Sequence, residues 1–150
     1  MKVNFGKHTG KSVESLILKE PGYINWALGN RDASGALLSV KREAERLIAI
    51  FDQKPFSVKC FGCRKNISSR ISLYSGGVSV FCWCDNCDPY SQGAFDGRLS
   101  IVKTYKHILQ HVELTCDNSN DSFKTIVRAV AELKGLPKRV GEKQAREFFA

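Results

Sequence analysis

The sequence has no run of apolar residues long enough to cross a bilayer, and its first residues, Met-Lys-Val-Asn-Phe-Gly, contain no apolar signal core. We therefore expect no membrane partner and an intracellular, reducing compartment, either cytoplasm or nucleus. Structural disulfides are rare in such compartments. The six cysteines of the chain accordingly favour metal binding over cross-linking.

Acidic residues are scarce in comparison with basic ones. The 150-residue chain has 15 Asp and Glu against 23 Lys and Arg, which gives a net charge of +8. This excess favours polyanionic partners, above all nucleic acid, although many soluble basic proteins bind none. A content of 43% apolar residues, with nine Phe, excludes a disordered composition.

Repeats and low-complexity tracts are also absent, and the chain divides into three segments of different character. Residues 1–53 have the pattern of a helical module, residues 56–90 that of a zinc ribbon with a β-hairpin, and residues 99–150 that of further helices. Residues 88–99 have the composition of a loop. The sequence therefore predicts an α+β protein whose C-terminal helices are able to pack back on the first segment.

The first segment contains clear signals for helix ends. Ser12 is a candidate N-cap for a short helix that Pro21 limits. A longer helix is expected to begin near Asp32 or Ser34, because apolar residues then recur at helical spacing. Pro55 is expected to end it.

The second segment changes from helical to strand periodicity. Ile71, Leu73, Val78 and Val80 alternate with polar residues around Ser75-Gly76-Gly77. This pattern predicts a β-hairpin whose turn contains the glycines. In the third segment, Ser100 is the expected cap of a helix that begins with Ile101.

Two Cys-x-x-Cys units flank the predicted hairpin: Cys60 with Cys63, and Cys84 with Cys87. Zinc prefers four soft ligands in a tetrahedron, and two residues between thiols let one tight turn direct both at a common point. The spacing and the hairpin together predict one structural Zn²⁺ on these four cysteines. Such a site is closed to substrate, so we expect it to stabilise the ribbon rather than to catalyse a reaction.

Cys82 leaves one ambiguity in the ligand set. It lies two residues before Cys84 and would be able to replace it. The second Cys-x-x-Cys spacing favours Cys84, and Cys82 is then a buried strand residue.

Residues 5–12, Phe-Gly-Lys-His-Thr-Gly-Lys-Ser, invite comparison with a nucleotide-binding phosphate loop. That loop needs four residues between its glycines, whereas three separate Gly6 from Gly10. The preceding strand is very short, and no acidic strand end follows to hold magnesium. These departures argue against nucleotide hydrolysis at this loop.

The same residues, followed by Pro21, Tyr23 and Trp26, resemble the small C-terminal domain of exodeoxyribonuclease X-type proteins over about residues 3–28. The resemblance implies an accessory module associated with DNA-processing proteins, and the catalytic domain of those exonucleases has no counterpart in this sequence. By position in the motif, the implied contacts are Lys7, His8, Lys11 and Trp26.

Simple chemistry supports part of this interpretation. Two glycines at a turn leave backbone N–H groups accessible, and Lys7 and Lys11 are able to neutralise a phosphate. The aromatic residues Phe5, Tyr23 and Trp26 are able to stack on bases, but we interpret them first as the core of the module.

Further basic residues surround the first Cys-x-x-Cys unit and precede the last helix. The candidate phosphate contacts there are Lys59, Arg64, Lys65, Arg70, Lys138 and Arg139. Phe61 and either Phe81 or Trp83 are candidates for base stacking. Three basic clusters in one short chain favour a shared anion-binding surface.

No catalytic set stands out. The acidic residues are scattered, and no nucleophile motif is present. His107 and His111 have helical spacing, but no Glu follows His107, so a second metal site is disfavoured. The sequence therefore favours a non-enzymatic protein.

The function that fits best is a zinc-containing, nucleic-acid-binding accessory protein, with DNA favoured over RNA. One alternative is an interaction adaptor that docks on a polymerase, nuclease or defence complex. A second alternative is a nuclease with an unrecognised site.

Overall fold

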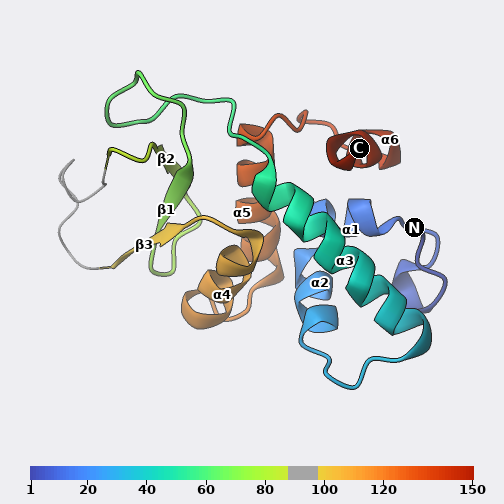
Figure 1. Ribbon diagram of the computed structural model, residues 1–150. Coiled ribbons are helices and arrows are strands. Elements are labelled where there is room, and N and C mark those ends of the chain that lie inside the picture. Colours follow the sequence, from blue (N-terminus) through green and yellow to red (C-terminus); the bar gives the residue numbers. More distant parts are fainter. Residues whose placement is uncertain (88–97) are drawn as a thin grey trace.

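The computed structural model describes residues 1–87 and 98–150. These residues form helices and a small antiparallel sheet, which confirms the α+β class (Figure 1). The helices are α1 (Val13–Lys19), α2 (Pro21–Leu28), α3 (Gly35–Gln53), α4 (Tyr105–Thr115), α5 (Asn120–Leu133) and α6 (Glu142–Phe149), and a short 3-10 helix covers Gly6–His8. The strands are β1 (Arg70–Tyr74), β2 (Phe81–Trp83) and β3 (Leu99–Val102).

The helix boundaries of the first segment follow the predicted signals. The Ser12 hydroxyl accepts a hydrogen bond from the Ser15 N–H at 3.0 Å and caps α1. Pro21 opens α2, where its missing N–H has no consequence. Ser34 is the N-cap residue of α3, and the helix ends two residues before Pro55.

The sheet has β1 at its centre, with β2 and β3 paired antiparallel on either side. The hairpin of β1 and β2 was predicted, but its second strand begins later than the sequence pattern indicates. Val78 and Val80 lie in the connection before β2, half-buried against the core. The glycine turn is present, because the Gly77 N–H donates to the Tyr74 carbonyl at 2.8 Å.

The third strand corrects the prediction for residues 99–102. Ser100 and Ile101 belong to β3 rather than to a helix start, and α4 is capped instead by the Thr104 hydroxyl, which accepts from the His107 N–H at 3.2 Å. The cause is the pairing of β3 with β1, a strand almost thirty positions earlier in the chain. Local periodicity cannot reveal such a pairing. The other residues of the predicted 88–99 loop, up to position 97, lie outside the described residues.

One hydrophobic core draws on all three sequence segments. Phe51 of α3, Leu73 of β1, Tyr105 of α4 and Phe148 of α6 are buried in it together. The Tyr105 hydroxyl donates to the Ile17 carbonyl at 2.8 Å, which ties α4 to α1. The C-terminal helices therefore do pack back on the first segment: α5 and α6 both contact α1.

The sheet lies at one end of the molecule, and the N-terminus lies with α1 and α6 at the other end (Figure 1). The long helix α3 runs between the two ends. Across the described ranges 1–87 and 98–150, none of the helices combines the length and the apolar character needed to cross a bilayer.

Candidate metal centre and its surrounding surface

Cys60, Cys63, Cys84 and Cys87 come together beside the sheet, as their spacing predicts. Their sulfur atoms all lie within 4.8 Å of one another. Cys60 and Cys84 are buried, whereas Cys63 and Cys87 are half-buried. Four sulfurs converging on one point form a closed site that fits a single metal ion.

Backbone hydrogen bonds shape the first cysteine turn. The Arg64 N–H donates to the Cys60 carbonyl at 2.9 Å, and the Gly62 N–H donates to the Cys60 sulfur at 3.2 Å. Arg64 then turns the chain with φ 58°, in the left-handed region. The Phe61 N–H donates to the Cys82 carbonyl at 2.9 Å, which fastens this turn to β2.

The electrostatics of the cluster suit a cation. Burial raises the pKa of Cys60, but hydrogen bonds from the backbone of Cys63, Cys84 and Gly62 outweigh it and lower the pKa to about 6. The pKa of Cys87 is raised instead, because its thiol donates to the Cys60 sulfur and the other sulfurs lie close to it. Thiolates crowded in this way are stable together only when a cation offsets their charge. The residues therefore fit a thiolate-bound metal ion.

Cys82 lies apart from the cluster. Its side chain is fully buried in the main core, on the β2 position opposite Ile71, and burial raises its pKa to about 11. The structure thus groups Cys84, not Cys82, with the other three ligands. All six cysteines are free thiols.

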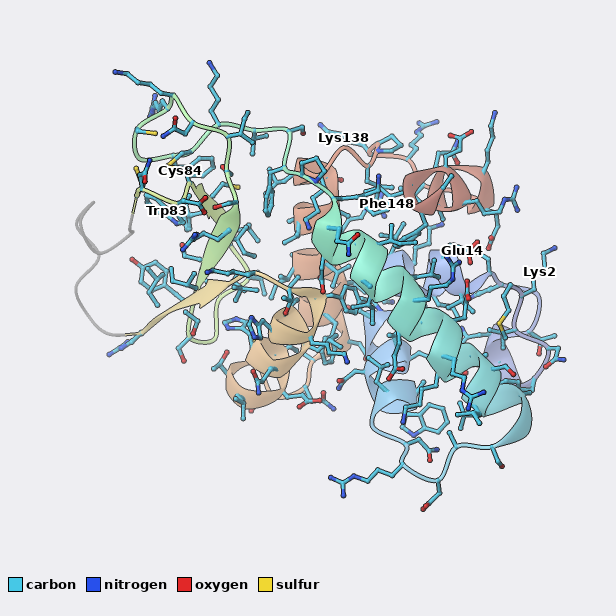
Figure 2. The ribbon with its side chains drawn as sticks, viewed as in Figure 1. Lys2, Glu14, Trp83, Cys84, Lys138 and Phe148 are labelled. Carbon is cyan, nitrogen blue, oxygen red and sulfur yellow. The ribbon has the colours of Figure 1, made fainter. Side chains whose placement is uncertain are left out.

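Gly62 and Trp83 support the cluster, and the sequence reasoning did not assign them this role. A Cβ at Gly62 would lie 3.1 Å from the Cys87 sulfur and 3.3 Å from the Trp83 ring, closer than ordinary van der Waals contact. Trp83 packs on Cys60 and Cys84, and its indole N–H donates to the Ser72 hydroxyl at 2.8 Å. Figure 2 shows Trp83 next to Cys84. In the sequence, the glycine between Cys60 and Cys63 is the feature that indicates a close approach of the backbone to the Cys87 and Trp83 side chains.

An open hollow of about 670 Å³ lies against the four-cysteine cluster. We call it the hollow; it is lined by Lys59, Cys60, Phe61, Arg64, Phe81 and Trp83. The Phe61 and Phe81 side chains are 47% and 37% exposed, which is unusual for phenylalanine. Their ring centroids are 6.0 Å apart and the ring planes meet at 82°.

The predicted basic residues around the hollow differ in availability. Lys59, Arg64 and Lys65 are exposed. Arg70, in contrast, donates to the Asp85 carboxylate at 2.6 Å, so its charge is already paired. The structure therefore brings two free cations of the predicted set, Lys59 and Arg64, to the wall of the hollow itself.

The N-terminal loop presents a different arrangement of its predicted residues. Lys7 and Lys11 are exposed, and Gly6 and Gly10 have φ of 67° and 87°. His8 is only 4% exposed and packs edge-on against Tyr23 with centroids 4.6 Å apart. A contact between His8 and phosphate would require this loop to open.

Trp26 corrects the interpretation of the aromatic residues as core. Its side chain is 55% exposed and lies 5.6 Å from the half-buried Tyr23 ring. The first residues of α2 are packed, whereas Trp26 projects from the helix surface, so Trp26 contributes little to the core.

Lys138 and Arg139 are exposed in the turn between α5 and α6, where the Arg128 guanidinium donates to the Lys138 carbonyl. Figure 2 shows Lys138 between the metal centre and α6, with Lys2 at the opposite end of the molecule from Cys84. Lys138 and the N-terminal end marked by Lys2 therefore lie apart from each other (Figure 2).

The two helical histidines of α4 face different surroundings. The His111 ring Nε2 lies 2.9 Å from the Gly77 carbonyl, and His107 is exposed. Within residues 1–87 and 98–150, the four cysteines are the group of potential metal ligands that the structure brings together.

Comparison with known families agrees with the resemblance seen in the motif. Residues 3–32 match the family described as exodeoxyribonuclease X-like C-terminal. The match covers the N-terminal loop, α1 and α2, and it stops well before the cysteines. No curated protein and no solved structure matches the chain.

Proposed function

We propose that this chain is a zinc-containing nucleic-acid-binding accessory protein that works with DNA-processing enzymes. The observation that carries the proposal is the hollow, in which exposed aromatic rings and unpaired cations stand directly on the four-cysteine centre. Cations neutralise phosphates, and aromatic faces stack on bases. The match of residues 3–32 to an exonuclease-associated family supports the link to DNA.

Zinc is the proposed ion because the ligand set is four sulfurs, the donors of structural zinc sites. The bound ion would hold the two cysteine turns together and thereby hold Phe61 and Arg64 in place. We expect the purified chain to carry one zinc per molecule by metal analysis. Cys84→Ser should abolish this content, whereas Cys82→Ala should retain it, because only Cys84 belongs to the cluster.

The proposed contacts fall into three regions. Lys59, Arg64 and Lys65 form the main one, and Arg70 contributes only if its pair with Asp85 opens. The remaining candidates lie elsewhere on the surface, in the N-terminal module and the last turn: Lys7, His8, Lys11, Trp26, Lys138 and Arg139. The segments 1–53, 56–90 and 99–150 are thus proposed as functional regions on a common core.

The test is binding of the zinc-loaded protein to labelled DNA and RNA at low and physiological salt. A triple variant in which Lys59, Arg64 and Lys65 are each replaced by Gln should bind more weakly. The slope of log affinity against log salt should fall by the amount expected for about three lost phosphate contacts. A matched control replaces three exposed cations elsewhere, Arg31, Arg42 and Lys106, with Gln. Both triple variants have the same net charge, so equal losses would show non-specific attraction instead of a site.

An interaction adaptor is the second candidate, and exposed apolar residues favour it. Leu114 and Ile101 are exposed beside a smaller hollow of about 230 Å³ between β3 and α4. An adaptor would keep its partner when the ribbon cations are removed and would bind nucleic acid weakly at both salt concentrations. Failure to bind any nucleic acid at either salt would therefore overturn the first proposal and favour this one.

A further inference from the structure

The two rings of the hollow are arranged as a corner. Phe61 comes from the first cysteine turn and Phe81 from the start of β2, and their planes are nearly perpendicular. Both side chains remain more than one third exposed, although a phenylalanine pair normally gains from burial. Their exposure thus leaves a ready aromatic surface for a flat ligand.

The geometry limits how such a ligand binds. A base sandwiched between two rings needs the planes of the two rings to be parallel. The Phe61 and Phe81 centroids are 6.0 Å apart at 82°, so a sandwich does not fit. The edge-to-face contact of the two rings is compatible with one base that stacks on the exposed face of a single ring.

The cations of the hollow suit the backbone that carries such a base. Lys59 and Arg64 line the same hollow and are exposed. Phosphates lie next to every base in a strand, so a stacked base brings phosphates into reach of both side chains.

Apart from the two cations, two polar groups of the hollow are already occupied. The Trp83 indole N–H is used by Ser72, and the Phe61 N–H is used by the Cys82 carbonyl. These two groups are therefore not available to read the hydrogen-bonding edge of a base, and the described lining offers the ring faces and the two cations. Recognition through a ring face and charge tolerates any sequence.

We propose that the hollow binds an unpaired base of single-stranded DNA and discriminates single strands from duplex. This inference rests on the proposed nucleic-acid function and specifies its substrate. Bases inside a duplex are stacked on both faces and cannot reach the Phe61 or Phe81 ring. A duplex would therefore meet the cations alone.

The test measures affinities in the zinc-loaded full chain and reads Trp83 emission in the same chain with Trp26→Phe, which leaves Trp83 as the one tryptophan. Oligothymidylate is compared with a blunt DNA hairpin of equal phosphate number whose loop is a base-free linker, so that all of its bases are paired. Binding is followed by polarisation of the labelled DNA and by Trp83 emission, because Trp83 lines the hollow. We expect the single strand to bind more tightly than the hairpin and to quench Trp83.

Variants separate stacking from charge. Phe61→Leu with Phe81→Leu should lower single-strand affinity about tenfold, the scale of losing one stacked base, and leave hairpin affinity unchanged. Tyr74→Leu, an exposed aromatic on the same sheet outside the hollow, should change neither. The double variant Lys59→Gln with Arg64→Gln should weaken the binding of both the single strand and the hairpin. Zinc content and thermal unfolding confirm that each variant is folded.

Four outcomes overturn the inference in different ways. Equal affinity for both DNAs, or single-strand affinity unchanged in the double Leu variant, removes the base-stacking role and leaves the nucleic-acid function standing. If Tyr74→Leu lowers single-strand affinity as much as the double Leu variant does, the binding is non-specific hydrophobic attraction to the protein surface. No binding of either DNA removes the proposed function as well.

Discussion

Gly62 is placed where a single methyl group would disturb the metal centre. Its backbone lies close to both Cys87 and Trp83, and both of these side chains pack in the small cluster around the cysteines. The requirement here is for space rather than for backbone conformation, because φ at Gly62 is not positive.

Gly62→Ala is therefore expected to lower zinc affinity by about tenfold or more, as changes beside metal ligands commonly do. Competition with a chromophoric chelator measures the affinity. Gly29→Ala is the control, since a Cβ there would meet its neighbours at 3.5 Å, an ordinary contact. Unchanged affinity in Gly62→Ala would show that the cysteine turns are looser than the structure indicates.

His8 is the residue from which we expect a pH response. Burial lowers its pKa from 6.5, Lys11 and Lys7 lower it further, and Glu20 opposes them. The unfolded chain therefore takes up the proton first as pH falls through 6.5. The free energy of unfolding should decrease over that range and level off below the folded-state pKa.

The prediction is that His8→Phe loses less stability between pH 7.5 and pH 5.5 than the unchanged chain, measured by urea unfolding. His107→Gln, which alters an exposed histidine, should retain the full pH response. Acid effects on the cysteine centre are common to all three proteins and cancel in the comparison. Parallel pH profiles would show that His8 ionises freely in the folded state.

At the scale of elements, Lys134 joins the ends of two helices. It follows α5, and its ammonium group donates to the Phe51 carbonyl at 2.7 Å and the Asp52 carbonyl at 3.4 Å, in the last turn of α3. The same group lies 4.8 Å and 5.1 Å from the rings of Phe51 and Phe56. A cation here satisfies the free carbonyls at a helix C-terminus.

Lys134→Met should reduce the free energy of unfolding by about 1–3 kcal/mol, because it leaves buried carbonyls without a donor. Urea unfolding provides the measurement. Lys124→Met, within α5, removes an exposed lysine paired loosely with Glu20, and about 0–1 kcal/mol is expected. Equal effects would mean that the buried contact adds nothing beyond a surface charge.

Elements that form from local signals were predictable, and those that depend on distant partners were not. Ser12 and Pro21 mark helix ends by their own chemistry, and the structure agrees. β3 was missed because its four residues suit a helix start equally well, and only pairing with β1 decides. Within the site, spacing identified the four cysteines, whereas the meeting of Phe61 with Phe81 depends on how the first turn packs against β2.

At the scale of the whole molecule, the cysteine centre forms its own small cluster beside the main core. Cys60, Trp83 and Cys84 pack together, while β1 and Cys82 belong to the large core with the helices. Stability should therefore be uneven across the protein.

If the chain carries zinc and binds DNA as proposed, chelation is expected to expose Trp83 and to abolish the DNA binding, yet to leave most of the helical circular dichroism. Trp83 emission in the Trp26→Phe background and far-ultraviolet spectra measure the two effects. Restoring zinc should reverse both. Collapse of the helical signal on chelation would show that the metal also supports the main core.

The N-terminus and the sheet, whose strand β2 carries Phe81 of the hollow, lie at opposite ends of the molecule, with α3 between them (Figure 1). Two weak contacts held apart by a rigid body act together only on a ligand long enough to reach both, and then strengthen each other through effective concentration. Affinity should consequently step up at a threshold length of single strand rather than climb evenly with each added nucleotide. Replacing Lys7 and Lys11 with Gln should remove the step and spare the binding of short strands, so that the protein behaves as a molecular ruler only while both ends are intact.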